Sequence, residues 1–388
     1  MANQHPIVFV HGLFGFGPDE LGSLKYWGKA FEVASPIEKR FEASVGPVSS
    51  AHDRACELVA QIKGTLVDYG EVHAREAGHE RYGDDYTGRG FMPEWDQQHP
   101  VHLVGHSLGS PTIRCLQHLL AQDHWGWGSN HRWVHSINTL SGVSNGTSLV
   151  FHFGADEKTG LMSREGICAT ILQVVQLYTA ATGGRVKLDD IYDFDLDHWG
   201  YKRDRNETLS DYLERVSESR FLLEKDNAAY SLTMQGAFEN NAVWRTYPDT
   251  YYFSYVTEKT WKEPIRGKYF PTPTMNPFMA LPSAYIGQKE FDNPPIPVEG
   301  FQSSDWWEND GLVPTYSQMY PRVSGDHAVA GEFDDASPVD LFRPGAWYYN
   351  WQRGMDHLDI CLIPPLLEPG RQEEFYRNLF VRLAALPV

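Results

Sequence analysis

Residues 101–109 read Val-His-Leu-Val-Gly-His-Ser-Leu-Gly, and this stretch decides the fold. A four-residue apolar run stopped by glycine is typical of a strand buried in a parallel sheet. The G-x-S-x-G motif follows at once, and residues 107–120 have a helical pattern, so Ser107 stands in the strand–turn–helix context of a nucleophile elbow. Gly105 and Gly109 would keep strand and helix from clashing while Ser107 Oγ points out of the sheet. The alternative interpretation is a turn without chemistry.

Similar patterns on either side of this stretch predict the rest of the fold. Residues 7–10 form another short apolar run, which ends in His11-Gly12-Leu13-Phe14-Gly15. A helix is expected from Ser50 to about Gly70, because apolar residues recur there at spacings of three and four. Further expected elements are strands at 134–140 and 251–256, and a C-terminal amphipathic helix with Phe375, Tyr376, Leu379, Phe380 and Leu383 on its apolar side. Strands alternating with helices predict an α/β fold, a mostly parallel sheet with helices on both faces.

Composition excludes several classes of protein. The chain has 388 residues and a formal net charge of −18, which argues against a duplex nucleic-acid binder because phosphate binding needs clustered Lys and Arg. No apolar run reaches the ~18 residues of a membrane span. Four cysteines without C-x-x-C spacing predict buried free thiols rather than a disulfide framework. No secretory signal is visible, so we expect either an intracellular protein or a secreted mature chain whose leader Met1 has replaced.

Acyl transfer by a serine also requires donors for the oxyanion, a base and an orienting carboxylate. The N–H of Leu108 is the first expected donor, and the N–H of Leu13 the second, since glycines flank Leu13 just past a strand. The alternative for His11-Gly12 is a tight turn only. His357 is the favoured base because it is late in the chain and precedes the last helix.

Other candidates for the base and the acid are weaker. His327, beside Asp326, is the second candidate for the base. Asp310 is the favoured acid because an Asp-Gly turn after bulky apolar residues can follow a strand end. The remaining acids upstream of His357 are expected to be solvated loop charges: Asp334, Asp335 and Asp340.

At these residues the chain resembles the thermoalkalophilic lipases of bacilli and, more distantly, the staphylococcal lipases. The resemblance spans nearly the whole chain through segments such as Lys25-Tyr26-Trp27-Gly28, Asp53-Arg54-Ala55-Cys56-Glu57, Glu308-Asn309-Asp310-Gly311 and Asp356-His357-Leu358. It implies an α/β-hydrolase fold, a catalytic triad of Ser107, Asp310 and His357, and oxyanion donors at Leu13 and Leu108. Gly105 and Leu108 depart from the Ala and Gln that the bacillus enzymes typically carry, and the change at Leu108 should spare a backbone donor.

The same resemblance implies a structural zinc ion held by Asp53, His73, His79 and Asp226. Two imidazoles and two carboxylates make a closed, charge-neutral shell with no open position for catalysis. Without the resemblance, Asp53 is simply the acidic member of a capping box with Ser50. The family's calcium position falls on Asp359 and Pro364, and because proline offers no carboxylate we expect weak or absent calcium binding.

These inferences together predict a lipase or carboxylesterase that works at a lipid–water interface. The helical pattern within residues 161–182 predicts a lid, with an ordinary core helix as the alternative. Two Pro- and Gly-rich stretches, 262–297 and 338–369, are expected to be irregular. Other functional hypotheses are a short-chain esterase or acyltransferase and a non-catalytic binding protein with the same fold. We expect one domain over residues 1–388, with a zinc-bound insertion at about 50–95 and lid and zinc-contacting helices at about 150–230.

Overall fold

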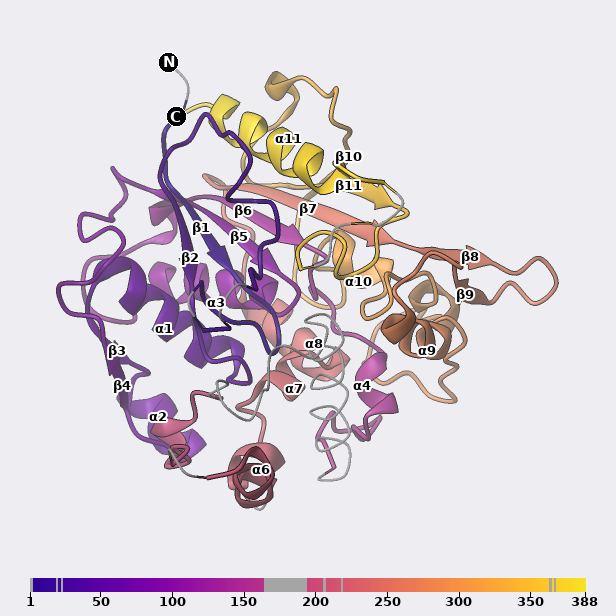
Figure 1. Ribbon diagram of the computed structural model, residues 1–388, viewed down its shortest axis with the longest axis horizontal. Helices are drawn as coiled ribbons and strands as arrows, with labels where there is room; N and C mark the ends of the chain where they lie inside the picture. The colour runs from indigo at the N-terminus through magenta and orange to yellow at the C-terminus, as the bar shows by residue number, and fades with distance from the viewer. Residues whose placement is uncertain are drawn as a thin grey trace.

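The computed structural model describes residues 3–18, 20–21, 24–163, 194–204, 207–217, 219–362, 365 and 368–388. Its centre is a seven-stranded sheet of order β10-β11-β7-β6-β5-β1-β2, in which every neighbouring pair is parallel (Figure 1). The strands are β1 (Ile7–Val10), β2 (Arg40–Ala43), β5 (Val101–His106), β6 (Val134–Leu140), β7 (Tyr251–Glu258), β10 (Val329–Glu332) and β11 (Trp347–Arg353). Two antiparallel pairs lie outside this sheet: β3 (Leu66–Asp68) with β4 (Tyr82–Asp85), and β8 (Thr260–Lys262) with β9 (Tyr269–Pro271).

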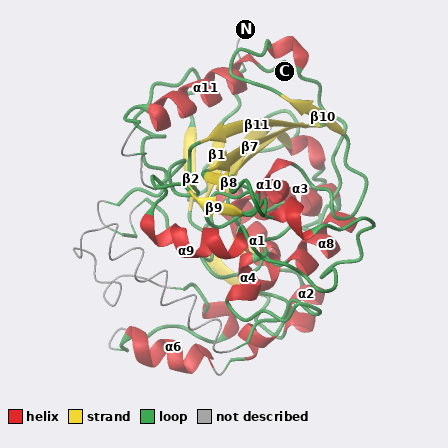
Figure 2. Cartoon of the chain, turned by 90° about the vertical axis from the view of Figure 1, so that its right-hand side faces the viewer, coloured by secondary structure: helices red, strands yellow, loops and turns green. Residues whose placement is uncertain are grey.

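Helices surround the sheet (Figures 1 and 2). The α-helices are α1 (Ala51–Lys63), α2 (Glu71–Ala77), α3 (Gly109–Ala121), α4 (Leu149–His152), α6 (Leu209–Ser217), α7 (Ala228–Ser231), α8 (Met234–Val243), α9 (Pro277–Ile286), α10 (Thr315–Met319) and α11 (Arg371–Ala385). Short 3-10 turns span His131–Trp133, Asp197–Trp199, Arg220–Leu223, Ser303–Trp306 and Val339–Leu341.

The central strands β1, β5, β6 and β7 are buried on both faces, as β1 illustrates. All four of its residues are buried, with Ile7 and Phe9 in one apolar cluster and Val8 and Val10 in another. The first cluster includes the apolar side of α11, and the second includes residues of α1 and α3, which Figure 1 places on the opposite side of the sheet. Because successive side chains of a strand point to opposite faces, an all-apolar strand requires cover on both. The expected α/β arrangement is therefore confirmed.

Most expected elements form where the pattern placed them. The helix expected at 107–120 is α3, the strand at 134–140 is β6, that at 251–256 is β7, and the C-terminal helix is α11. The helix expected from Ser50 to Gly70 is wrong at its end: α1 stops at Lys63, and Leu66 belongs to β3. Gly64 adopts a left-handed conformation (φ 75°) and its N–H bonds to the Ala60 carbonyl, which closes the helix.

The two stretches expected to be irregular are more ordered than the sequence suggests. Residues 262–297 contain α9, which Asn276 caps through the Phe278 N–H and which begins with Pro277. A proline in the first turn of a helix costs no hydrogen bond, so it begins this helix rather than breaking it. Residues 338–369 contain β11. The helical pattern expected within residues 161–182 lies outside the described residues except for 161–163, and the single-domain assignment stays a prediction.

Candidate active site

Ser107 lies on a sharp turn between β5 and α3. Its φ is 53°, a left-handed conformation that a non-glycine residue adopts only where the surroundings enforce it. The Ser107 N–H bonds to the Leu140 carbonyl at 3.0 Å, and its carbonyl accepts from the Ser110 N–H at 3.0 Å. A Cβ on Gly109 would lie 2.1 Å from the Val10 carbonyl oxygen, so the turn requires glycine there. The expected elbow geometry is therefore present.

His357 and Asp310 form a buried pair. His357 Nδ1 lies 2.8 Å from Asp310 Oδ2, and the His357 N–H bonds to the Asp310 carbonyl at 2.9 Å. The carboxylate also accepts from the Thr257 hydroxyl at 2.7 Å and from the N–H groups of Leu312 and Val313 at 3.0 and 2.8 Å. A carboxylate at Nδ1 favours the tautomer with its proton on Nδ1, so the Nε2 lone pair is free to accept a proton.

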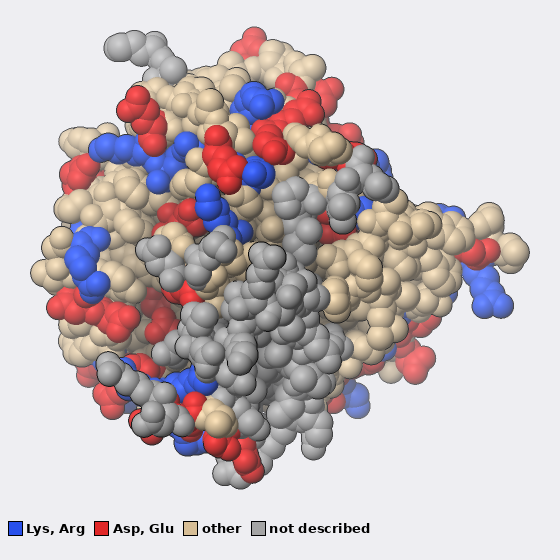
Figure 3. Space-filling view, viewed as in Figure 1, with Lys and Arg blue, Asp and Glu red and all other residues tan. Residues whose placement is uncertain are grey.

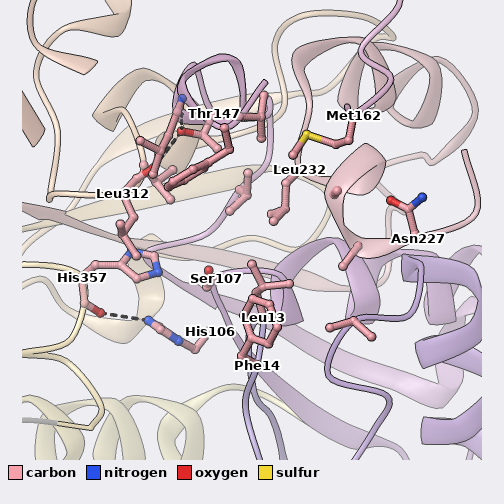
Figure 4. Close-up of a pocket in the computed structure, with 18 of the residues that line it drawn as sticks. Leu13, Phe14, His106, Ser107, Thr147, Met162, Asn227, Leu232, Leu312 and His357 are labelled. Carbon is pink, nitrogen blue, oxygen red and sulfur yellow. Dashed lines mark hydrogen bonds between the residues drawn. The ribbon is translucent and has the colours of Figure 1, made fainter. Parts of the chain in front are cut away.

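Ser107 and His357 both line an apolar cavity of about 190 Å³ (Figure 4). The apolar side chains around it come from distant parts of the chain, among them Leu13, Val150, Phe194, Phe221, Leu232 and Leu312. Such a space suits a hydrocarbon chain better than a polar ligand, because a polar group would lose its hydration there.

The two expected oxyanion donors lie beside Ser107. A Cβ added to Gly12 would lie 2.8 Å from Ser107 Cβ, which shows how closely the loop after β1 approaches the elbow. In the part of the chain that the structure describes, neither the Leu13 N–H nor the Leu108 N–H donates to a protein acceptor. Backbone donors kept free next to a nucleophile are what an oxyanion hole needs.

His106 and Tyr26 connect the loop after β1, the turn that carries Ser107 and the loop that carries His357. Sequence reasoning missed both residues. The Tyr26 hydroxyl accepts from the Gly12 N–H at 2.7 Å and lies 2.6 Å from His106 Nδ1. His106 Nε2 lies 3.0 Å from the His357 carbonyl oxygen (Figure 4). The carbonyl can only accept, so Nε2 carries the proton and Nδ1 accepts from Tyr26. Burial, with the nearby His357 ring, lowers the pKa of His106 well below its usual value, which keeps the ring neutral in this tautomer. The only sequence signal for this role is the position of His106 inside G-x-S-x-G.

The other candidates for base and acid lie outside the cavity lining. His327 bonds through Nδ1 to the Thr246 hydroxyl at 2.9 Å and through Nε2 to the Asn241 carbonyl at 3.2 Å. Asp334, Asp335 and Asp340 are exposed, as expected for solvated charges. The structure therefore brings His357, but not His327, to the same cavity as Ser107, and Asp310 contacts His357 without lining the cavity.

A second cluster joins Asp53, His73, His79 and Asp226, whose potential ligand atoms all lie within 4.8 Å of one another. His73 Nε2 is 3.0 Å from Asp53 Oδ1 and 3.2 Å from Asp226 Oδ2. Ser50 does cap α1 by accepting from the Asp53 N–H at 3.1 Å. The Asp53 side chain, however, faces the imidazoles, so the interpretation of Asp53 as the acidic member of a capping box is wrong.

The donor set of this cluster fits a metal ion. His79 Nδ1 lies 2.7 Å from the Glu80 carbonyl and therefore carries the proton, which leaves a lone pair on Nε2. That nitrogen faces Asp226 Oδ2 at 3.3 Å, and both atoms are buried without a hydrogen-bond partner. Two facing acceptors repel unless a proton or a cation lies between them. His198, which sequence reasoning missed, adds a contact of 3.2 Å from Nε2 to Asp53 Oδ2.

Near the expected calcium position an ammonium group lies between two carboxylates. Lys259 Nζ lies 2.5 Å from Asp359 Oδ2 and 3.2 Å from Asp356 Oδ2, and the three side chains are at most 7% exposed. Asp356 also accepts from the Asn276 N–H at 2.9 Å. Pro364 lies outside the described residues. The ammonium already lies between these carboxylates and offsets part of their charge, which is consistent with weak calcium binding; that expectation stays a prediction.

Charged side chains of both signs are mixed on one face of the molecule, where Figure 3 shows Lys and Arg interspersed with Asp and Glu. Among the described helices, none has the length and apolar character needed to cross a bilayer. The described cysteines, Cys56, Cys115 and Cys361, are buried free thiols as predicted, whereas Cys168 lies outside the described residues.

Comparison with known proteins places this geometry among lipases. A family model described as "Lipase-like, C-terminal domain" matches residues 3–362. Lipase 2 of Staphylococcus aureus is 33% identical over 384 residues, which cover 92% of this chain and 50% of that protein. The lipase of Staphylococcus hyicus is 32% identical over 382 residues, covering 92% and 54%. The chain thus spans about half the length of the curated relatives it matches.

Solved structures agree with this placement. EstA from Clostridium botulinum superposes with a TM-score of 0.83 at 31% identity, covering 99% of this chain and 88% of that one. Lipase 1 from Pelosinus fermentans gives 0.79 at 30% identity and covers 100% of both chains. Staphylococcus hyicus lipase gives 0.72 at 30% identity, with 98% and 94% covered. The α/β-hydrolase-like fold and the staphylococcal relation are confirmed; the thermoalkalophilic relation stays a prediction.

Proposed function

The chain belongs to the lipase family, and from this membership we propose that it is a serine carboxylic ester hydrolase that acts on acylglycerols at a lipid–water interface. One observation carries the proposal: Ser107 and His357 line the same apolar cavity, and Asp310 holds His357 Nδ1 at 2.8 Å. A hydrocarbon acyl chain can occupy that cavity while its ester carbonyl lies at Ser107.

In the proposed reaction, Ser107 Oγ attacks the ester carbonyl and passes its proton to His357 Nε2. Asp310 keeps the proton of the imidazole on Nδ1 and stabilises the imidazolium that forms. The N–H groups of Leu13 and Leu108 would hold the oxyanion, and the loss of one such donor typically costs about 10²–10³ in kcat. His357 then protonates the leaving alcohol. In the second half of the reaction His357 accepts a proton from a water molecule, which attacks the acyl-enzyme, and returns that proton to Ser107 Oγ.

Asp53, His73, His79 and Asp226 would hold the zinc ion. A zinc ion bound there supplies folding energy rather than reaction chemistry, since four protein ligands leave no open coordination position. The orphaned His79 Nε2 and Asp226 Oδ2 support this assignment, because the ion would satisfy both. The lid proposed at 161–182 lies outside the described residues except for 161–163, and of these Met162 lines the cavity.

The test combines covalent labelling with a substrate series. A fluorescent alkyl phosphonate should label the wild-type protein and a Ser304→Ala variant, which removes an exposed serine, but not Ser107→Ala. Labelling of Ser107→Ala at the wild-type rate would refute the assignment of the nucleophile. Activity on p-nitrophenyl esters should rise from short to long acyl chains and increase above the micellar threshold. A maximum at acetate or butyrate without that increase would instead indicate a short-chain esterase.

A further inference from the structure

A second group of potential metal ligands lies close to the first, on α1 and just after α3. His52 and Cys56 are four residues apart on α1 and so share one face of the helix, while His124 follows the end of α3. One potential ligand atom from each of the three residues lies within 4.8 Å of the others. None of them belongs to the set proposed for zinc.

The hydrogen bonds of the two histidines leave lone pairs available. His52 Nε2 lies 2.9 Å from the Tyr69 carbonyl, so this nitrogen carries the proton and Nδ1 has a free lone pair. His124 Nε2 is buried without a hydrogen-bond partner. An imidazole that donates one N–H to a backbone carbonyl and keeps the other nitrogen free is oriented as metal-binding histidines are.

We propose that His52, Cys56 and His124 form a binding site for a soft cation, of which Cu(I) matches the donor set best. A thiolate and two neutral imidazoles are soft ligands, and with a monovalent cation they give a neutral complex in a buried position. On binding, the Cys56 thiol loses one proton to solvent and forms the sulfur–metal bond.

The two clusters are in direct contact. The rings of His52 and His73 stack, with centroids 3.6 Å apart and an interplanar angle of 25°, and His52 precedes Asp53 in sequence. The imidazole of each site therefore fixes the orientation of the other. We expect the soft-cation site to be most ordered when zinc occupies the Asp53 cluster, so the protein is tested with zinc bound there.

Cadmium titration of the zinc-loaded protein tests the proposal, because thiolate coordination gives an ultraviolet charge-transfer band that the sulfur-free Asp53 cluster cannot produce. The wild type should develop this band with saturation at one equivalent. Cys56→Ser should abolish it, and His124→Gln should weaken binding at least tenfold. Cys115→Ser is the matched control, since it removes another buried thiol from the neighbouring helix α3, and it should leave the band unchanged.

A competition experiment with Cu(I) then identifies the cation. Bicinchoninate, a Cu(I) chelator, competes with the protein for the ion. The wild type and Cys115→Ser should each remove one equivalent of Cu(I) from bicinchoninate, whereas Cys56→Ser and His124→Gln should not. The proposal is overturned if the wild type shows no thiolate band, if the band persists in Cys56→Ser, or if Cys115→Ser removes it equally. Because His124 is only partly buried, His124→Gln should still fold if Cys56→Ser does not, and full-strength binding by His124→Gln would also refute the site.

Discussion

Replacing Lys259 by Met should destabilise the protein more than any exposed ion pair could explain. The ammonium lies 2.5 and 3.2 Å from the carboxylates of Asp359 and Asp356, and its side chain is 6% exposed. At an effective dielectric constant of about 20, each contact is worth roughly 5–7 kcal/mol of attraction, most of which the desolvation of the ions offsets. Removing one partner leaves the other charges buried, which typically costs about 3–5 kcal/mol. We expect a loss of that size in the free energy of unfolding.

The loss in the free energy of unfolding caused by Lys259→Met should grow as the pH rises. Burial and the neighbouring Asp356 charge raise the pKa of Asp359 to about 6 in the wild type, against about 3.9 for an ordinary Asp. A raised carboxyl pKa favours the folded state at low pH and costs stability as the pH rises from about 4 through 6. Without the ammonium the pKa rises further, and a protonated Asp359 needs no counter-charge. The difference between variant and wild type should therefore be largest at pH 8 and shrink toward pH 5.

Urea unfolding at pH 5 and pH 8, followed by fluorescence, measures both effects. Lys25→Met is the matched control, because Lys25 pairs with Glu32 at 3.5 Å with side chains 58% and 45% exposed, and it should cost less than about 1 kcal/mol. Since Asp356 immediately precedes His357, ester hydrolysis by folded Lys259→Met should also fall. A loss at pH 8 no larger than that of Lys25→Met would refute the reasoning.

Four other outcomes are expected. Tyr26→Phe removes the donor to His106 and should lower kcat about tenfold with little change in KM, since an unmet buried hydrogen bond costs about 1–3 kcal/mol; unchanged kcat would contradict the connection of the three loops. Asp310→Asn should lower kcat by about 10⁴ in steady-state assays, because the amide favours the wrong tautomer. A strong chelator should lower the melting temperature of the wild type, measured by calorimetry. Asp226→Asn should have a lower melting temperature even without chelator, and the chelator should change it less; equal changes in the two proteins would contradict the metal assignment. Gly109→Ala should give little soluble protein, since its Cβ would lie 2.1 Å from the Val10 carbonyl oxygen, and a folded, active variant would contradict that clash.

Local sequence determined the elbow and the two-sided burial of the central strands. Ser107 is placed by its own neighbours, because a buried strand, a glycine-bounded turn and a helix follow one another without interruption. The four apolar residues of β1 likewise require cover on both faces wherever they lie in the sheet. Such features depend on side-chain size and backbone conformation within a few residues, so a sequence pattern records them directly.

Tertiary structure alone decided which distant groups meet. Asp53 has a local role that its sequence suggests, and only the approach of His73, His79 and Asp226 shows that its carboxylate faces a cluster of ligands instead. The contact between Tyr26 and His106 joins residues that are 80 positions apart in sequence, and the contact between Lys259 and Asp359 joins residues that are 100 positions apart. No periodicity encodes such pairs, because hydrogen bonds and buried charges act over a few ångströms in space. The sequence therefore placed the proposed nucleophile, Ser107, whereas folding placed the groups that hold its proposed partners.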